Sequence, residues 1–106
     1  MIPKIIHYCW FGRNPLPLLA VKCIESWKRY FPDYEIREWN EDNFNVNMIP
    51  YTREAYEAKK YAFVSDYARF YILYYYGGLY FDTDVEVIKP MNDIIERLGA
   101  IYYGSD

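Results

Sequence analysis

The sequence predicts an α/β domain in which helices flank a mostly parallel sheet of the Rossmann type. Strand-like and helix-like segments alternate along the 106 residues, as they do in layered α/β proteins. The first of these segments is almost continuously apolar, which is typical of a strand buried on both faces. A glycine pair, Gly77–Gly78, separates the strongest helical pattern from a short apolar strand. With 53% apolar residues, the chain can fill one packed core.

The first 39 residues predict a strand, a helix and a second strand. Lys4–Phe11 is rich in β-branched and aromatic residues, and Gly12–Pro17 interrupts it with glycine and two prolines. Apolar residues recur at helical spacing over Leu18–Phe31, and Pro32 follows the end of this segment. Tyr34–Trp39 mixes apolar with charged residues, which indicates a strand. A unit of this kind joins two parallel strands through a right-handed crossover.

The middle of the chain predicts a loop followed by two helices. Asn40–Pro50 is polar and rich in asparagine, so we expect a loop. Tyr51–Lys59 is a candidate short helix with Thr52 as its N-cap. Ala62–Tyr76 has the strongest helical pattern, and Gly77–Gly78 supplies the left-handed conformation that ends a helix.

The last quarter of the chain predicts short elements. Leu79–Asp82 and Val85–Ile88 are expected to form strands, and Pro90 ends the second. We expect a short helix over Asn92–Leu98 and a final strand over Ala100–Tyr103. Because the sequence stops just after that strand, residues 1–106 are interpreted as the N-terminal part of a larger domain, truncated at its C-terminus.

Composition and charge exclude several classes of protein. The net charge is −3 and no basic block occurs, so we expect no nucleic-acid partner. The longest apolar run, residues 61–76, contains two charges and is shorter than the ~20 residues of a membrane-spanning helix, so we expect no transmembrane segment. Cys9 and Cys23 lack CxxC spacing, and Met1–Lys4 leads directly into a strand without a signal peptide. We therefore expect reduced thiols in a cytoplasmic protein, with a peripheral position at the inner face of the membrane as a variant.

Two aspartates, Asp82 and Asp84, follow the predicted strand after the glycine pair. An Asp-x-Asp pair alone is weak evidence, because a shuffled sequence of this composition would contain about 0.45 such pairs on average. Its context is stronger, since open α/β sheets bind ligands at the carboxyl ends of their strands. Glu86 lies close in sequence, and crowded carboxylates favour a hard cation such as Mn²⁺ or Mg²⁺. The alternative is that Asp82 and Thr83 only cap a turn.

Four further residues are candidates for a site. Asp66 and Arg69 are three residues apart on the predicted helix, so their side chains share a face. They either form a local ion pair or bind a sugar nucleotide. Trp10 is expected near the ligand edge of the sheet, where its indole could stack on a base or simply pack in the core. His7 is more consistent with a hydrogen-bonded core residue than with a catalyst.

Three blocks of sequence, in this order, carry a family resemblance. They are Ile2–Gly12, Ala62–Arg69 and Tyr75–Asp84. Together they resemble the DXD-containing glycosyltransferases that include the yeast initiating α-1,6-mannosyltransferase and bacterial capsular polysaccharide transferases. The clostridial glucosylating toxins share the same Asp-x-x-Arg and DXD layout. The similarity covers most of residues 2–90.

The resemblance implies a GT-A type fold that binds a nucleoside diphosphate sugar together with Mn²⁺ or Mg²⁺. By position, Asp84 matches the direct metal ligand, while Asp82 contacts ribose or sugar and helps to place the ion. Asp66 and Arg69 match the pair that holds the donor sugar, and Trp10 matches the position near the base. No catalytic nucleophile or base can be assigned.

The function implied by this resemblance is transfer of a hexose to an acceptor hydroxyl, with retention, in polysaccharide or glycan synthesis. The acceptor would be a glycan or a lipid-linked molecule, and residues 1–106 would be the donor-binding part. The alternative is a truncated remnant that binds a nucleotide sugar without turnover. An aspartyl-phosphate phosphatase is disfavoured because Glu86 stands where that signature requires Thr or Val. The sequence does not indicate an oligomeric state.

Overall fold

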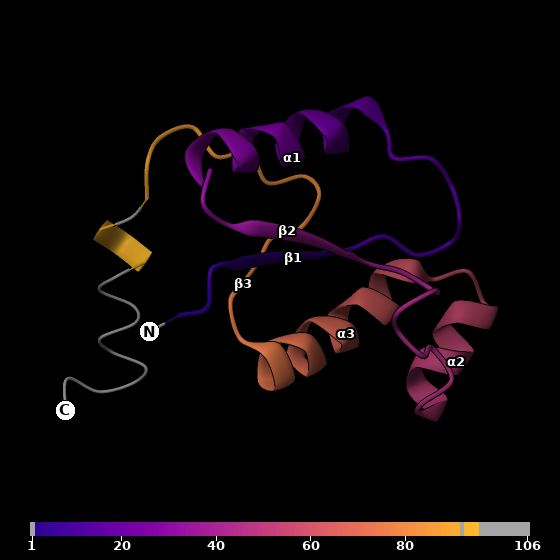
Figure 1. Cartoon of the computed structure of the whole chain (residues 1–106). Coiled ribbons are helices and arrows are strands. Elements are labelled where there is room, and N and C mark those ends of the chain that lie inside the picture. The colour runs from indigo at the N-terminus through magenta and orange to yellow at the C-terminus, as the bar shows by residue number, and fades with distance from the viewer. Residues whose placement is uncertain (1, 92, 96–106) are drawn as a thin grey trace, which may run out of the picture.

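A parallel three-stranded sheet forms the centre of the molecule (Figure 1). The computed structural model describes residues 2–91 and 93–95. The elements, in chain order, are β1 (Ile5–Cys9), α1 (Leu18–Tyr30), β2 (Glu35–Trp39), α2 (Pro50–Glu57), α3 (Tyr61–Tyr76) and β3 (Leu79–Tyr80). This arrangement confirms the α/β fold class predicted from the sequence.

The strand β1 occupies the centre of the sheet, in the order β2-β1-β3. It pairs in parallel with β2, with Ile5 opposite Glu35, and in parallel with β3, with Ile6 opposite Leu79. Because all three strands run the same way, their carboxyl ends meet at one edge of the sheet. The residues that follow Cys9 and β3 therefore emerge side by side at that edge.

The helices cover the two faces of the sheet separately. Helix α1 lies on one face, and α3 lies on the other with α2 packed beside it (Figure 1). Alternate side chains of β1 point to opposite faces, as the period of two in a strand requires. Ile6 and Tyr8 join the core under α1, whereas Cys9 joins the core against α3.

The core under α1 is centred on Trp27, which is fully buried. Around it pack the buried side chains Ile6, Tyr8, Cys23, Ile24, Phe31, Val87 and Ile95. The buried residues of α1 recur every three or four positions, which is the stripe that an amphipathic helix presents to a sheet. The helix ends at Tyr30 because Pro32 follows, and residues before proline disfavour helical angles.

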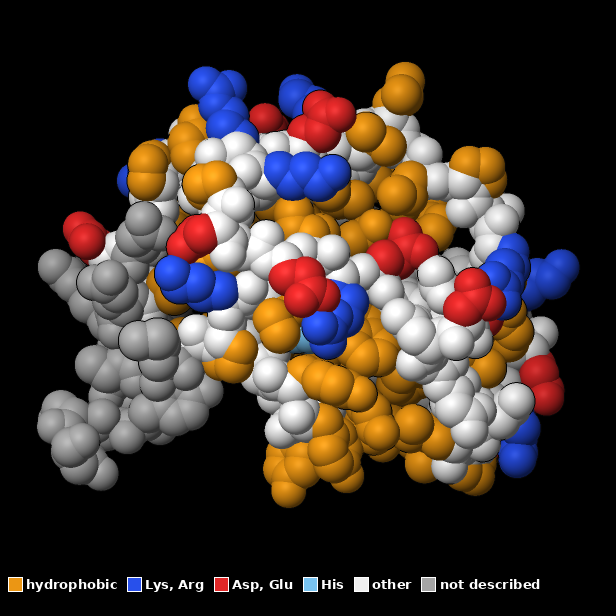
Figure 2. All heavy atoms as spheres, in the orientation of Figure 1, with side chains coloured by type: hydrophobic (Ala, Val, Ile, Leu, Met, Phe, Trp, Pro, Cys, Tyr) orange, Lys and Arg blue, Asp and Glu red, His pale blue; other side chains and the backbone are white. Residues whose placement is uncertain are grey.

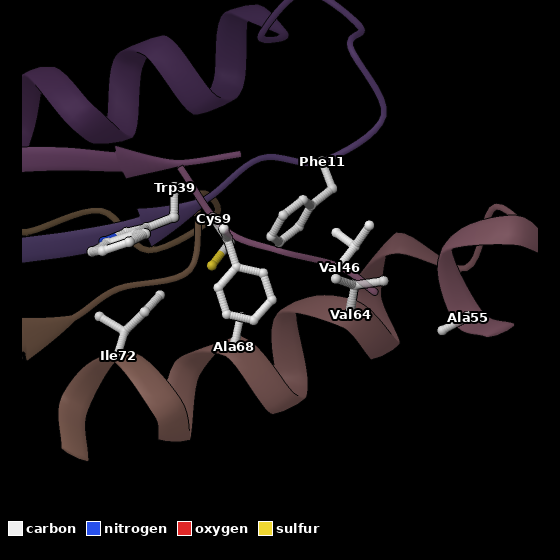
Figure 3. Close-up of a cluster of buried hydrophobic side chains, with 9 residues drawn as sticks. Cys9, Phe11, Trp39, Val46, Ala55, Val64, Ala68 and Ile72 are labelled. Carbon is white, nitrogen blue, oxygen red and sulfur yellow. The ribbon is translucent and has the colours of Figure 1, made fainter. Parts of the chain in front are cut away.

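The core on the other face uses small residues of α3. Val64, Ala68 and Ile72 are fully buried on one stripe of the helix. Their four-residue spacing places them on the same side of the helix. In Figure 3, Ile72 points toward Trp39 and Val64 lies beside Val46. The opposite side of α3 exposes large aromatic rings, and Figure 2 shows hydrophobic side chains gathered over this helix.

The turn between α3 and β3 is built on Gly77 and Gly78, which both have positive φ angles, of 67° and 93°. Gly77 donates its N–H to the carbonyl of Leu73 and ends the helix. Gly78 lies so close to β1 that a Cβ atom there would stand 2.6 Å from the carbonyl oxygen of Ile5. Only glycine satisfies both the backbone conformation and this close approach. The sequence-based prediction of a glycine stop is confirmed.

Thr52 is not the N-cap of α2, as the sequence had indicated. The helix begins at Pro50, with Ile49 in the cap position, because proline at the first helical position lacks only an N–H that would be unpaired anyway. Thr52 therefore falls inside the first turn and is fully buried. Its hydroxyl donates to the carbonyl of Val46 over 2.7 Å and is also 3.2 Å from that of Ile49.

The predicted strand over Val85–Ile88 is also wrong. These residues have no partner strand in the part of the sheet that the structure describes, and they form irregular chain that is hydrogen-bonded to two side chains of α1. The strand predicted over Leu79–Asp82 is shorter and pairs over Leu79–Tyr80. Of the helix predicted over Asn92–Leu98, only 93–95 are described, and they are helical. The strand predicted over Ala100–Tyr103 lies outside the described residues.

We predict that Gly78→Ala destabilises the fold more than Gly77→Ala. Both substitutions force a side chain into a positive-φ conformation, which costs about 1–3 kcal/mol. Gly78→Ala adds a clash with the backbone carbonyl of Ile5, whereas Gly77→Ala meets only the ring of Pro3 at 3.1 Å. The free energy of unfolding, from urea titrations of both variants, measures the difference. Equal destabilisation would contradict this account of the turn.

Candidate functional site

A pocket of about 450 Å³ opens at the carboxyl edge of the sheet. Its walls come from the loop after β1, from one side of α3, and from the turn after β3. The pocket brings together the five residues to which the sequence and the family resemblance assign a part in binding: Trp10, Asp66, Arg69, Asp82 and Asp84. Segments up to 74 positions apart in the chain therefore converge on one cavity, at the edge where parallel sheets bind ligands.

The guanidinium of Arg69 links the helix wall of this pocket to the strand wall. Its Nη2 donates to Oδ1 of Asp66 over 3.0 Å and lies 3.8 Å from Oδ1 of Asp82. The guanidinium carbon stands 5.1 Å from the centre of the Tyr80 ring, within reach of a cation–π interaction. Its Nε is buried and has no hydrogen-bond partner among the described residues. Arg69 is thus anchored by its neighbours while keeping a donor unused.

The two aspartates sit on a tight turn directly after β3. Phe81 donates its N–H to the carbonyl of His7, and Val85 donates to the carbonyl of Asp82, each over 3.0 Å. The main chain therefore closes the turn, and the side chain of Asp82 faces Arg69. Both carboxylates remain exposed at the pocket mouth. This arrangement differs from the alternative in which Asp82 and Thr83 serve only as turn caps.

The carboxylate oxygens of Asp82 and Asp84 are suitable ligands for a hard divalent cation that also binds a ligand molecule. The side chain of Glu86 does not line the pocket, so the crowd of three acids expected from the sequence does not form there. Within residues 2–91 and 93–95, no three His, Cys, Asp or Glu side chains are placed to hold a metal ion. Two carboxylates with open space beside them match the way Mg²⁺ is bound through one or two acids plus substrate phosphates. Asp82 and Asp84 therefore fit such an ion only together with an oxygen-rich ligand.

The floor of the pocket is apolar and does not ionise at neutral pH. Burial raises the pKa of the Cys9 thiol to about 12, and burial likewise raises the pKa of Tyr80. Cys9 and Cys23 are both free thiols, and both are buried. A neutral thiol is a poor nucleophile, so Cys9 contributes packing and not covalent chemistry.

The loop after β1 is held by Glu41, a residue that sequence reasoning missed. Its side chain is only 9% exposed and accepts hydrogen bonds from the N–H of Gly12 at 2.5 Å and from the hydroxyl of Tyr56 at 2.8 Å. Burial acts to raise the pKa of Glu41, but the hydrogen bond from Gly12 and its other partners outweigh burial and leave the pKa lowered. No motif marks this position in the sequence. Its place in an asparagine-rich loop gives no hint of burial.

Trp10 sits on this loop at the pocket rim. Its indole Nε1 donates to the carbonyl of Asn14 over 2.7 Å, and its backbone N–H donates to the carbonyl of Trp39. The ring also packs against the core under α1, while the residue lines the pocket. The position of Trp10 is therefore compatible with both alternatives from the sequence, packing in the core and contact with a ligand.

His7 is a core residue, which agrees with the interpretation favoured from the sequence. It is fully buried, its Nδ1 accepts from Nε1 of Trp39 over 3.0 Å, and its Nε2 donates to the carbonyl of Gly77 over 2.8 Å. Burial lowers the pKa of His7, so the imidazole is neutral and ties β1 to the end of α3. It does not line the pocket.

Residues 17–99 match a protein family described as the glycosyltransferase sugar-binding region containing a DXD motif. Inositol phosphoceramide mannosyltransferase 1 of Schizosaccharomyces pombe is 29% identical over 94% of this chain. Inositol phosphoceramide mannosyltransferase 3 of the same yeast is 33% identical over 89%, and an uncharacterized glycosyltransferase of Acanthamoeba polyphaga mimivirus is 34% identical over 90%.

The chain spans only part of these relatives, namely 33%, 27% and 40% of their lengths. No solved structure shows a significant match. None of the helices within the described residues has the length and apolar character needed to cross a membrane.

We predict that the free energy of unfolding falls as the pH is lowered from about 7.5 to 5.5, and that His7→Gln flattens this slope. The pKa of His7 is lower in the folded state than its ordinary value of ~6.5, so the unfolded chain takes up the proton more readily. Burial of neutral His7 therefore contributes to the free energy of unfolding above pH ~6.5, the ordinary pKa. This contribution is lost as the pH falls from there toward the lower pKa of the folded state.

His7 is the sole histidine of the chain, and this pH window lies above the titration range of the carboxylates. Urea titrations at several pH values measure the slope. A slope that persists unchanged in His7→Gln, or a wild-type protein that gains stability at lower pH, would contradict the assignment.

Proposed function

Because the chain belongs to the family of glycosyltransferases whose sugar-binding region contains a DXD motif, we propose that its pocket binds a nucleoside diphosphate sugar with Mn²⁺ or Mg²⁺. The whole protein would transfer the hexose to an acceptor hydroxyl. This chain spans a minor part of its relatives' lengths, so donor binding is the activity proposed for these residues themselves. A remnant that binds the donor without turnover is the alternative.

The observation that carries this proposal is the convergence of two acids and one arginine on a single pocket. Asp82 and Asp84 lie on the turn after β3, and Arg69 faces them from α3. A diphosphate needs cationic partners, and a divalent ion held by carboxylates supplies one where side chains alone supply few. The pocket also has the size of ordinary small-molecule sites.

The metal would be held by Asp84 and Asp82, with remaining positions left to the ligand and water. Such an ion acts as a Lewis acid that neutralises the charge developing on a leaving diphosphate. The residues of the chain have three tasks here: they hold the carboxylates at the mouth of the pocket, orient the donor, and keep the floor dry. The apolar floor lowers the effective dielectric constant beneath the ligand and so strengthens charge–charge interactions there.

Arg69 and Asp66 would orient the donor sugar and its phosphates. The planar guanidinium donates to phosphate oxygens at fixed geometry, and its buried Nε is a donor still without a partner among the described residues. Asp66 anchors Arg69 and keeps a side chain that is 54% exposed, so its second oxygen can accept from a sugar hydroxyl. Trp10, on the rim opposite α3, would present its indole to the base.

The relatives support a narrower proposal for the sugar and the acceptor. Two of those compared above are named as mannosyltransferases that act on inositol phosphoceramide. We therefore favour mannose as the transferred hexose and a lipid-linked acceptor, ahead of a capsular polysaccharide. Retention at the anomeric carbon belongs to the same proposal. A lipid-linked acceptor would place the protein at a membrane surface.

We predict that Asp84→Asn removes most of the Mn²⁺-dependent affinity for UDP or GDP. Loss of a carboxylate ligand is expected to weaken metal-supported binding by about tenfold or more, which corresponds to at least ~1.4 kcal/mol. Titration calorimetry with and without Mn²⁺ measures this difference. The side chain is exposed, so the fold should be unaffected.

Asp93→Asn is the matched control, because it removes the same charge from an exposed residue outside the pocket lining. Unchanged Mn²⁺-dependent affinity in Asp84→Asn, or an equal loss in Asp93→Asn, would remove the assignment of Asp84 to the metal.

We predict that Arg69→Ala weakens binding of a nucleoside diphosphate sugar more than binding of the free nucleotide. The lost charge-assisted hydrogen bonds are worth about 1.5–3 kcal/mol. Arg69→Lys should recover little, because an ammonium group lacks the planar fork. Arg53→Ala, on the exposed side of α2, is the control for loss of charge. Equal losses for the two ligands would contradict a contact between Arg69 and the donor sugar, because the diphosphate is common to both ligands.

A further inference from the structure

The segment after the aspartate turn is held by α1 and not by the sheet. The indole Nε1 of Trp27 donates to the carbonyl of Val85 over 2.7 Å. The backbone N–H of Val87 donates to Oγ of Ser26 over 2.9 Å. Each bond joins residues about 60 positions apart in the chain, so neither arises from local geometry. We call these two side chains, Ser26 and Trp27, the α1 clamp.

Both members of the α1 clamp are themselves fixed in place. Trp27 is fully buried, and its ring packs edge-on against Tyr8 and Phe81 at centroid distances of 5.7 and 5.4 Å. Tight packing on both sides leaves the indole N–H one direction in which to donate. The hydroxyl of Ser26 donates to the carbonyl of Cys23 over 2.6 Å, which turns an oxygen lone pair toward the N–H of Val87.

Asp84 lies between two anchored points of the chain. Upstream, Phe81 donates its N–H to the carbonyl of His7 in β1. Downstream, the α1 clamp holds Val85 by its carbonyl and Val87 by its N–H. No described strand pairs with the chain beyond the turn. The α1 clamp therefore supplies the hydrogen bonds that fix the path of this segment. The position of the Asp84 carboxylate therefore depends on α1, which lies on the face of the sheet opposite α3.

We propose that Ser26 and Trp27 are positioning residues that hold the carboxylate of Asp84 ready to bind a divalent cation. This inference rests on the proposed function of the pocket. Mg²⁺ and Mn²⁺ ligands must be placed within narrow limits, and a turn free to move would lose entropy when the ion binds. Because the α1 clamp is uncharged and lies outside the pocket, it acts on the metal-dependent part of binding alone.

Ser26→Ala is the sharpest test of the α1 clamp. It removes the acceptor for the N–H of Val87 but introduces a better helix former, so α1 itself is not weakened. We expect hydrogen exchange at the Val87 amide to accelerate by about tenfold, as the loss of one partly buried hydrogen bond implies. Ser26→Thr restores a hydroxyl that can make the same bonds from a helix, and slow exchange should return. Unchanged exchange in Ser26→Ala overturns the clamp whether or not the protein binds a nucleotide.

The binding test uses UDP and GDP, each with and without Mn²⁺. In Ser26→Ala we expect the gain in affinity due to Mn²⁺ to fall about three- to tenfold, with recovery in Ser26→Thr. The affinity measured without metal should stay at its wild-type value. Lys28→Ala, on the exposed side of the same helix, is the matched control and should change neither quantity.

The outcomes separate this inference from the proposed function. If the wild-type protein binds neither nucleotide with Mn²⁺, the proposed function fails, and the role of the α1 clamp toward a metal fails with it. If the wild-type protein binds and Ser26→Ala keeps the full gain from Mn²⁺, the inference alone is overturned. Equal losses with and without metal would show a general structural effect and would also overturn it.

Discussion

The Gly77–Gly78 turn packs closely against β1, and this contact positions the elements that form the site. Gly78 approaches the carbonyl of Ile5 more closely than any side chain would allow, and His7 accepts from Trp39 while donating to Gly77. These contacts bring the end of α3 onto the central strand. They also set the register in which β3 starts, with Leu79 opposite Ile6. One turn thus positions both the helix that carries Arg69 and the strand that leads to the aspartates.

The Gly77–Gly78 turn also shapes the site, because α3 and β3, the two elements that it joins, lead to opposite walls of the pocket. Arg69 reaches from α3 to Asp82 just beyond β3, and the pocket between them closes against the loop after β1. The two faces of the sheet contribute in different ways. The α3 face supplies the positively charged guanidinium of Arg69, whereas the α1 face supplies uncharged hydrogen-bonding groups that hold the chain beyond Asp84. Charge and positioning therefore come from separate layers of the domain.

The spacing of apolar residues and the positions of glycine and proline were enough to predict β1, α1, β2, α3 and the glycine stop. In these segments the local sequence pattern and the tertiary environment favour the same structure. The alternating residues of Val85–Ile88 predict a strand, yet the carbonyl of Val85 and the N–H of Val87 bond to side chains of α1, which no local pattern reveals. Spacing predicted the Asp66–Arg69 pair. The burial of Glu41 and the absence of Glu86 from the pocket depend on distant packing, so neither could be read from neighbours in sequence.

Paramagnetic relaxation by Mn²⁺ would show whether Asp82 and Asp84 hold the ion, because it locates the ion without any substitution. Mn²⁺ would be titrated into ¹⁵N-labelled protein with UDP or GDP present. We expect that the amide signals of Asp82–Val85 broaden first, together with those of Arg69 and Ser65 across the pocket, and that magnesium in excess restores them. Broadening centred elsewhere, such as on the exposed acids Asp33 and Asp42, would contradict it. So would broadening that does not depend on the nucleotide.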